Sequence, residues 1–464
     1  MNKISMALCA FPLSLSMNAQ TAITSDVLSM LEKAQPTTAA DRALRNVVSS
    51  MSISKVALDQ QHAAAATDTY FSLETKNQGV TNQESSGRCW LFTGLNVLRH
   101  RAAQKIGAPG LMFSQMYGFF YDQLEKSNLF LQGIIDTRTL SLDDRTVDWL
   151  FQNPLSDGGT YTGVADLVSK YGLVPQEVMA ETYAANHTDE LNSHLKRKLR
   201  EFGIQLREKA QQGASQKQLE AEKVEMLKTI YHMLTLAYGE PVKKFEWAPK
   251  DANGKIIGEA RTFTPLEFYR YCCPDEDLNA DYVMLMNDPS RDYNKVYEIE
   301  YDRHLYDGHN WLYLNLPIED IKPLCIASIK DSLQMYFSCD VGKQLNRNNG
   351  LLDLKNYDYE SIFGTKFGMN KKQRIQSHDS GSSHAMTLMA VDLDANGKPT
   401  KWKVENSWGA SYGFAGHLIM TDEWFDEYMF RVVVNKKYLS DAQRQLLKQK
   451  PVRLPAWDPM FMEE

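Results

Sequence analysis

The sequence predicts an α+β fold in which a helix-rich first half precedes a strand-rich last third. In the first half, apolar residues recur at helical spacing over long segments. After about residue 310, short apolar runs are separated by turn residues. This segregation favours a helical domain followed by a β-rich domain over a parallel sheet built from alternating strands and helices.

The helices are expected to begin near the N-terminus, where Val27, Leu28 and Leu31 have helical spacing. A later helix should start at Arg88 and present one broad apolar face. That face comprises Trp90, Leu91, Leu95, Val97 and Leu98. The predicted helical segments are 20–66, the stretch from Arg88, 113–126 and 164–172.

Residues 187–238 should form a helical hairpin with a charged outer face. Two sets of apolar residues recur at spacings of three or four: Leu191, Leu195, Leu199 and Phe202, then Val224, Leu227, Tyr231 and Leu234. An insertion that packs on a neighbour and a pair of ordinary surface helices explain this pattern equally well.

The strands of the last third are marked by a turn signal. "SSHAMTLMAVDLD" and "KWKVENSW" flank Asn396-Gly397, a pair typical of β-hairpins. "HLIM" and "FRVVV" should be further strands, and Ser440 with Gln443 forms a capping box for a last helix. Pro451 should end that helix, so that the tail after it is extended.

Composition narrows the class of protein. The chain has 464 residues, of which 43% are hydrophobic, which is typical of a soluble folded protein and excludes wholesale disorder. Its formal charge of −7 offers no basic surface, so nucleic-acid binding is not expected. The sequence contains no spacing of Cys and His typical of zinc sites, and we expect neither a metal nor a cofactor. Adjacent Cys272 and Cys273 are interpreted as structural.

The N-terminus resembles a signal peptide over residues 1–19. Lys3 precedes an apolar segment, and Asn18-Ala19 ends in the small residue that a signal peptidase prefers. The segment is too short to anchor the protein in a membrane after cleavage. We therefore expect export to the periplasm or the medium, with a cytoplasmic location as the alternative.

Cys89 is the leading candidate nucleophile. It directly follows the small polar run "QESSGR" and starts an apolar helix. Unpaired N–H groups and the positive end of the helix dipole stabilise a thiolate at that position.

A thiolate of this kind needs a histidine and a group that orients it. His384 starts a strand after a polar loop, and Asn406 ends the partner strand of the predicted hairpin, so the two should lie close together. Acyl transfer also needs donors for an oxyanion, which the side chain of Gln83 and the backbone N–H of Cys89 could supply.

These segments resemble the papain-like cysteine peptidases, in particular the bleomycin hydrolase and aminopeptidase C branch. The resemblance covers the chain from about residue 45 to the C-terminus. It is carried by "NQESSGRCW", "HAMTLMAV", "KWKVENSWG", "NPLSDGGTYTGVADLVSKYGLVPQEVMAETY", "VMLMNDPSRDYNKVYEIEY", "IASIKDSLQMYFSCDVGK", "MTDEWFDEYMF" and "LPAWDPM".

By this resemblance, Cys89 is the nucleophile, His384 the general acid and base, Asn406 the orienting residue and Gln83 the oxyanion donor. Trp408 is similar to the tryptophan that shields the His–Asn hydrogen bond from water. Four further residues are implied in substrate binding, namely Gly158 and Gly159 through the peptide backbone, Trp408 beside the site, and Glu464 through the terminal carboxylate. A simple turn remains the alternative for the two glycines, and core packing the alternative for Trp408.

The resemblance also implies a papain-like two-domain fold with a helical left domain, a β-rich right domain and a helical insertion. It further implies a homohexamer, and a C-terminal arm that lies in the active-site cleft and makes the enzyme an aminopeptidase.

The expected parts are a signal peptide (1–19), an N-terminal helical extension (20–75), a helical domain with the catalytic Cys (76–186), an inserted helical or oligomerisation region (187–310), a β-rich domain with the catalytic His and Asn (311–450) and the C-terminal arm (451–464).

The leading hypothesis is a cysteine aminopeptidase that releases N-terminal residues from peptides. An endopeptidase is the alternative if the C-terminal arm is mobile or removed. A nucleic-acid-binding hexamer is a further alternative, which the acidic charge disfavours.

Overall fold

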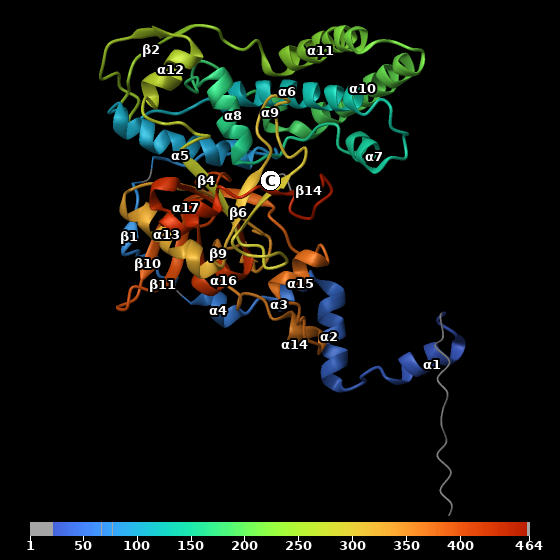
Figure 1. Ribbon diagram of the computed structural model, residues 1–464. Helices are drawn as coiled ribbons and strands as arrows, with labels where there is room; N and C mark the ends of the chain where they lie inside the picture. The colour runs from blue at the N-terminus through green and yellow to red at the C-terminus, as the bar shows by residue number, and fades with distance from the viewer. Residues whose placement is uncertain (1–21, 66, 77, 462–464) are drawn as a thin grey trace, which may run out of the picture. The chain divides into compact units, whose positions relative to one another are not determined.

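The computed structural model describes residues 22–65, 67–76 and 78–461 of the chain (Figure 1). The predicted signal peptide and Glu464 lie outside the described residues. The chain divides into two units, one of Met1–Leu58 with Tyr359–Thr365 and one of Asp59–Asp358 with Lys366–Glu464.

The smaller unit is helical. Its described helices are α1 (Ser25–Lys33), α2 (Ala39–Ser50), α3 (Ile53–Ala57) and α14 (Tyr359–Phe363). Thr38 caps α2 in a reciprocal capping box with Asp41, and α14 packs against α3. With α4 (Gln60–Ala64) of the larger unit, helices α1 to α3 confirm the helical prediction within the described residues 22–65, and residues 20, 21 and 66 lie outside the described part of the chain.

In the larger unit, the helices that follow Cys89 form one layer, drawn at the top of Figure 1. They are α5 (Cys89–Lys105), α6 (Gln115–Asp136), α7 (Arg145–Gln152), α8 (Tyr161–Tyr171), α9 (Tyr183–Asn186), α10 (Thr188–Gln211), α11 (Gln216–Tyr238) and α12 (Pro265–Cys272). Most of α5 is buried, because α6 and α8 pack against it on one side and strand β10 on the other.

The predicted helical hairpin is confirmed as α10 and α11, which pack on α6. Ser215 and Gln218 form the capping box that starts α11. Leu195, Leu199 and Leu234 are buried as the spacing predicted, whereas Val224 is 51% exposed.

Among the described residues, twelve strands form one sheet, in the order β14-β5-β6-β4-β13-β7-β10-β11-β12-β9-β8, with β1 paired to β10. Their bounds are β1 (Leu73–Glu74), β4 (Tyr282–Met286), β5 (Lys295–Ile299), β6 (Leu312–Asn315), β7 (Met335–Cys339), β8 (Leu345–Asn346), β9 (Leu351–Leu352), β10 (His384–Leu393), β11 (Pro399–Glu405), β12 (His417–Thr421), β13 (Met429–Asn435) and β14 (Val452–Leu454). The remaining elements along this part of the chain are α13 (Ile318–Lys330), α15 (Lys371–Gln376), α16 (Asp422–Tyr428), the 3₁₀ helix η1 (Lys436–Tyr438) and α17 (Asp441–Leu446).

The hairpin predicted at Asn396-Gly397 is confirmed. β10 and β11 pair antiparallel, and the Asp394 carboxylate accepts hydrogen bonds from the backbone N–H groups of Asn396 (2.8 Å) and Lys398 (2.9 Å). β10 also pairs with β7, where His384 stands opposite Cys339. His384 therefore begins a strand that is paired on both sides.

The expectation that strands begin only after about residue 310 is wrong. β4 and β5 lie in the sheet, and β2 (Phe245–Trp247) pairs with β3 (Arg261–Phe263) in a separate ribbon. β4 reads "YVMLM", a short continuous apolar run whose periodicity does not distinguish a buried strand from a buried helix. The region 187–310 thus contributes to the sheet as well as the helical layer.

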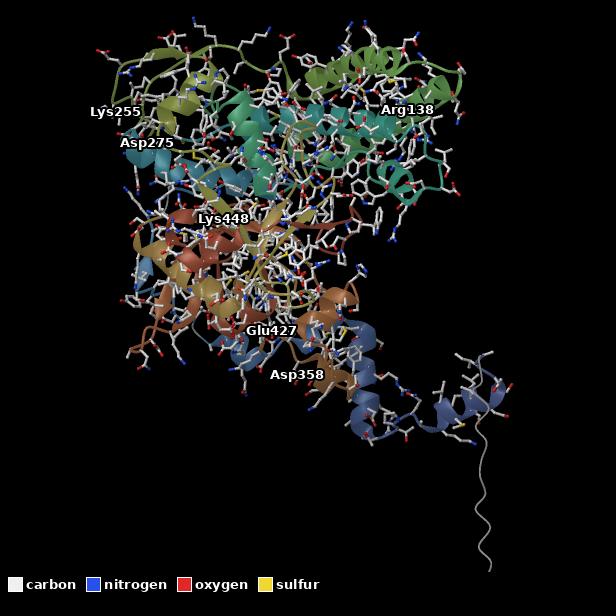
Figure 2. All side chains as sticks on the ribbon, viewed as in Figure 1. Arg138, Lys255, Asp275, Asp358, Glu427 and Lys448 are labelled. Atoms are coloured by element: carbon white, nitrogen blue, oxygen red, sulfur yellow. The ribbon has the colours of Figure 1, made fainter. Side chains whose placement is uncertain are left out.

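Charged side chains gather at the margin of the larger unit. Figure 2 shows Asp275 near the edge of the helical layer, where its carboxylate lies 2.7 Å from the Lys105 ammonium.

Cys272 and Cys273, at the end of α12, are buried thiols without a disulfide, and burial raises the pKa of Cys273 to about 12. None of the helices among the described residues is both long and apolar enough to cross a membrane.

Candidate active site

Cys89 is the first residue of α5, and its side chain is buried. The turn before it is held by Arg88, whose guanidinium donates to Glu181 (2.7 Å), Asn186 (3.1 Å) and Ser86 (3.0 Å). The first N–H groups of a helix have no partner within the helix, so the sulfur lies where an anion is stabilised. This setting favours a thiolate at position 89.

His384 and Asn406 lie together, as the hairpin predicted. His384 Nε2 is 2.8 Å from Asn406 Oδ1, which also accepts a hydrogen bond from the backbone N–H of Ser407 at 2.8 Å. Because Oδ1 accepts from Ser407, the imidazole must donate through Nε2. Nδ1 is then the ring nitrogen that can exchange a proton with a thiol.

Trp408 covers this pair. Its ring stacks on the His384 ring with centroids 4.7 Å apart, and the Tyr412 ring packs edge-on against Trp408 with centroids 4.9 Å apart. His384 is 4% exposed and Asn406 1% exposed, so water has little access to their hydrogen bond. In a low-dielectric setting such a bond is stronger than it is in water.

Gln83 is held in one orientation by two residues. Its Oε1 accepts from the Ser407 hydroxyl at 2.5 Å, and its Nε2 donates to the Ser86 carbonyl at 2.6 Å. The backbone N–H of Gln83 donates to the Ser407 carbonyl at 2.8 Å. An amide NH₂ has two donors, so one remains that can stabilise an oxyanion beside Cys89.

A buried polar cluster joins α5 to the end of β11. The Asn96 amide and the Arg99 guanidinium both donate to Oε1 of Glu405, at 2.9 and 3.3 Å. Asn96 also donates to Thr81, two residues before Gln83. The cluster therefore ties the helix of Cys89, the segment of Gln83 and the strand that ends at Asn406.

Sequence reasoning missed Ser407 and this cluster. Asn96 and Arg99 stand three residues apart in a helix that is buried nearly throughout, and polar residues on such a helix are a signal for buried partners. Nothing in the sequence identifies Glu405 as the partner, because it lies 309 positions from Asn96.

Gly158 and Gly159 lie in a buried segment just before α8. The Trp90 indole donates to the Asp157 carbonyl at 2.9 Å, so this segment is tied to the residue after Cys89. The Lys126 ammonium donates to the Gly158 carbonyl in a short hydrogen bond.

The described part of the C-terminal arm is firmly held. β14 pairs parallel with β5, after which Asp458 forms an ion pair with Arg291. The Arg431 guanidinium donates to the Met460 carbonyl at 2.8 Å, and the Phe461 ring packs edge-on against Trp149 at 5.2 Å. The arm is extended at β14, as predicted, and continues in turns.

Two cavities adjoin this arm. One of about 290 Å³ is lined by Phe461 and by residues of the segment before Gly158, including Asn153 and Ser156. The other, of about 500 Å³, is lined by Phe461, Trp457 and Asn153 together with Ser383, the residue before His384. Phe461 thus lines the same cavities as residues adjacent to Gly158 and to His384.

The described residues contain no group of three or more His, Cys, Asp or Glu side chains placed to hold a metal ion. The chemistry of this arrangement is that of a thiol, an imidazole and amide donors. Such a set performs acyl transfer through a covalent thioester.

Comparisons with known proteins agree with this geometry. The model of the Peptidase C1-like family matches residues 22–461. Human bleomycin hydrolase is 41% identical over 390 residues, covering 82% of this chain and 85% of that protein. Aminopeptidase C of Lactobacillus delbrueckii subsp. lactis is 39% identical over 398 residues, covering 85% of this chain and 88% of that protein.

A solved structure extends the agreement to the fold. The crystal structure of PepW from Lactobacillus rhamnosis HN001 matches with a TM-score of 0.90 at 36% identity, covering 96% of this chain and all of the PepW chain. The predicted papain-like α+β fold is confirmed. The chain belongs to the Peptidase C1-like family, in the branch of bleomycin hydrolase and aminopeptidase C, and is a cysteine peptidase.

Proposed function

We propose that the protein is a cysteine aminopeptidase that releases N-terminal residues from peptides. The observation that carries the proposal is the C-terminal arm, whose Phe461 lines cavities together with Ser383 and with the segment before Gly158. An arm in this position leaves room for only a short part of a substrate on the amino side of the scissile bond. The names aminopeptidase C and bleomycin hydrolase among the relatives favour the same reading.

In the proposed reaction, the Cys89 thiolate attacks the carbonyl carbon of the first peptide bond. The resulting oxyanion is stabilised by the Gln83 side chain and the Cys89 backbone N–H. The His384 imidazolium then gives its proton to the leaving amine, and the C–N bond breaks to leave a thioester on Cys89. His384 next takes a proton from water, which attacks the carbonyl carbon of the thioester. The C–S bond then breaks, which releases the amino acid and restores the Cys89 thiolate beside the His384 imidazolium.

Asn406 and Trp408 do not react themselves, but they fix the orientation and the surroundings of His384. Asn406 holds the Nε2–H donor of His384, so that Nδ1 faces the reacting groups throughout. A neutral amide does this without a second negative charge, which would compete with the thiolate for the imidazolium. Trp408 limits the access of water to that hydrogen bond.

The first test is the Cys89→Ala variant with an aminoacyl fluorophore as substrate. We expect loss of at least about a thousandfold in kcat/KM, because no other group can form the thioester. A Cys325→Ala variant, which removes a buried thiol in the sheet domain, is the matched control and should keep activity. Residual activity in Cys89→Ala equal to the unmodified protein would reject Cys89 as the nucleophile.

The exopeptidase assignment is tested separately from the nucleophile. N-terminally acetylated peptides should not be cleaved by the full chain. A variant that ends after Leu454, and so lacks the arm beyond β14, should cleave them as an endopeptidase. Cleavage of acetylated peptides by the full chain would favour the endopeptidase alternative.

Export and assembly are further parts of the proposal. We propose that residues 1–19 act as a signal peptide, supported by their apolar segment after Lys3 and the small residue Ala19. Intact mass of the secreted protein should then correspond to a chain that starts at residue 20. We also propose a homohexamer, for which sedimentation analysis should give six chains per particle.

A further inference from the structure

A buried charged cluster lies directly beneath the segment that contains Gly158 and Gly159. Asp122 and Lys126 stand one turn apart on α6, with the ammonium 3.3 Å from the carboxylate. His304, in the connection between β5 and β6, places Nδ1 2.5 Å from the other carboxylate oxygen. The exposed fractions of the three residues are 0%, 5% and 1%, so the cluster is shielded from water.

Three successive backbone carbonyls of this segment are held, two by Lys126 of the Asp122 cluster and the one between them by Trp90. Lys126 donates to the carbonyls of Ser156 (3.1 Å) and Gly158, and Gln123 donates to that of Ser156 at 2.9 Å. The carbonyl between them, on Asp157, is held by the Trp90 indole. Trp90 in turn packs edge-on against the His304 ring at 4.6 Å, which links the cluster to the start of α5.

His304 packs directly against the glycine backbone. A Cβ atom at Gly159 would lie 2.2 Å from the His304 ring, and one at Gly163 would lie 2.3 Å from it. Only glycine leaves room for the ring at these positions. The backbone N–H of Thr160 faces His304 Nε2 at 3.4 Å, so Nδ1 is the nitrogen that donates to Asp122.

Gly159 differs from its neighbours in its backbone hydrogen bonding. Within the described part of the chain, no hydrogen bond engages its N–H or its C=O, although the residue is buried. The groups on either side of it are held by Lys126, Trp90 and His304. An N–H and a C=O without partners in a fixed segment are suited to pair with an extended peptide.

We propose that Asp122, Lys126 and His304 are positioning residues that shape the Ser156–Gly159 segment so that Gly159 binds the backbone of the substrate. Lys126 supplies the hydrogen bonds to the segment, Asp122 balances its charge, and His304 sets the distance between the segment and Trp90. The inference rests on the proposed function, since it takes the bound strand to be a peptide substrate.

The first experiment compares Lys126→Met with the unmodified protein in peptide hydrolysis. We expect KM to rise about tenfold or more, with kcat changed by less than about threefold, because the lost hydrogen bonds order the binding segment and not the nucleophile. Lys126→Arg keeps the charge and the donors and should recover most of the affinity. Lys170→Met, which removes a lysine of α8 that pairs with Glu125 and Asp307, is the control and should leave KM unchanged.

Two readouts separate positioning from damage to the nucleophile or to folding. The rate at which iodoacetamide alkylates Cys89 should stay within about twofold of the unmodified rate in Lys126→Met. If that rate falls in parallel with kcat/KM, the cluster acts on the thiolate and the proposal is rejected. If Lys126→Met does not fold, Gln123→Met removes one donor to Ser156 and should raise KM by a smaller factor.

Amide hydrogen exchange tests the inference without any peptidase activity. In a Cys89→Ala background, a saturating peptide should slow exchange at Gly159, and Lys126→Met should abolish this protection. Protection that persists in Lys126→Met would overturn the positioning role. Absence of peptide hydrolysis by the unmodified protein, with this protection intact, would reject the proposed function and keep the assigned binding segment.

Discussion

Two buried polar clusters adjoin the helix that begins at Cys89, and their carboxylates differ in how they respond to burial. The Asp122 cluster lies within the helical layer, and the Glu405 cluster (Asn96, Arg99 and Glu405) joins α5 to the sheet. Burial alone would raise both pKa values. Lys126 and His304 nevertheless hold the pKa of Asp122 below its ordinary value, whereas burial raises the pKa of Glu405 to about 7 against the attraction of Arg99.

The difference between the pKa values of Asp122 and Glu405 follows from the number and placement of their hydrogen-bond and ion-pair partners. Asp122 has a partner at each carboxylate oxygen, with Lys126 and Gln123 on Oδ2 and His304 on Oδ1. Glu405 receives both of its donors on Oε1, and the nearer one is the neutral amide of Asn96. A buried carboxylate stays ionised only where charged partners offset its desolvation, so the first cluster keeps a fixed charge and the second titrates near neutral pH.

The largest expected effect comes from removing Asp122. Asp122→Ala leaves the Lys126 ammonium buried without its carboxylate, which should lower the free energy of unfolding by about 3–5 kcal/mol. Urea unfolding followed by tryptophan fluorescence measures this change. Asp307→Ala removes a carboxylate from an ion pair that is 65% exposed on that side, and should change the free energy by less than about 1 kcal/mol.

If Asp122→Ala and Asp307→Ala lower the free energy of unfolding equally, the Asp122 cluster is no more stabilising than a surface ion pair. The difference proposed between the carboxylates of Asp122 and Glu405 would then be wrong.

The pH dependence of stability should come from the Glu405 cluster. Its folded-state pKa is raised from 4.5 to about 7, so the native state binds the proton more tightly than the unfolded chain. The stabilisation that Glu405 contributes by binding its proton in the folded state is fully present below about pH 4.5 and is lost as the pH rises through about 7. Over that range, the loss should be on the order of 3 kcal/mol.

Glu405→Gln isolates this contribution, because glutamine keeps the Oε1 acceptor for Asn96 and cannot lose a proton. We expect urea midpoints of Glu405→Gln and the unmodified protein to agree at about pH 4 and to diverge at about pH 8, where the variant is more stable. A constant difference between the two proteins from about pH 4 to about pH 8 would contradict the assignment.

The smallest effect is expected at Ser407, which links the strand end after Glu405 to Gln83, the proposed oxyanion donor. Ser407→Ala removes the hydroxyl that orients Gln83, while the hydrogen bond from Gln83 to Ser86 remains. We expect kcat to fall about fivefold with KM unchanged, since a neutral hydrogen bond contributes about 1 kcal/mol. The measurement is steady-state hydrolysis of an aminoacyl fluorophore.

Gln83→Ala provides the upper limit for this effect, because it removes the donor itself. A Ser407→Ala enzyme as impaired as Gln83→Ala would mean that the hydroxyl does more than orient the amide.

Local signals were enough to predict several elements of the fold. The helix at Cys89, the α10–α11 hairpin and the β10–β11 hairpin each depend on spacing or turn residues within one short segment. The strand β4 escaped prediction because its five residues are all apolar, so the sequence shows no alternation of apolar and polar side chains. Its place in the sheet depends on β13, a partner almost 150 positions later.

The sequence by itself determined the residue types of the proposed reactive set, because Cys89, His384, Asn406 and Gln83 stand in motifs that can be recognised without knowing any contact. Only the tertiary structure decided what holds those residues in place. Glu405 meets Asn96, Ser407 meets Gln83 and His304 meets Asp122 across 309, 324 and 182 positions. Such pairs leave no local pattern, since a buried polar side chain takes whichever partner the packing of the chain brings within hydrogen-bond distance.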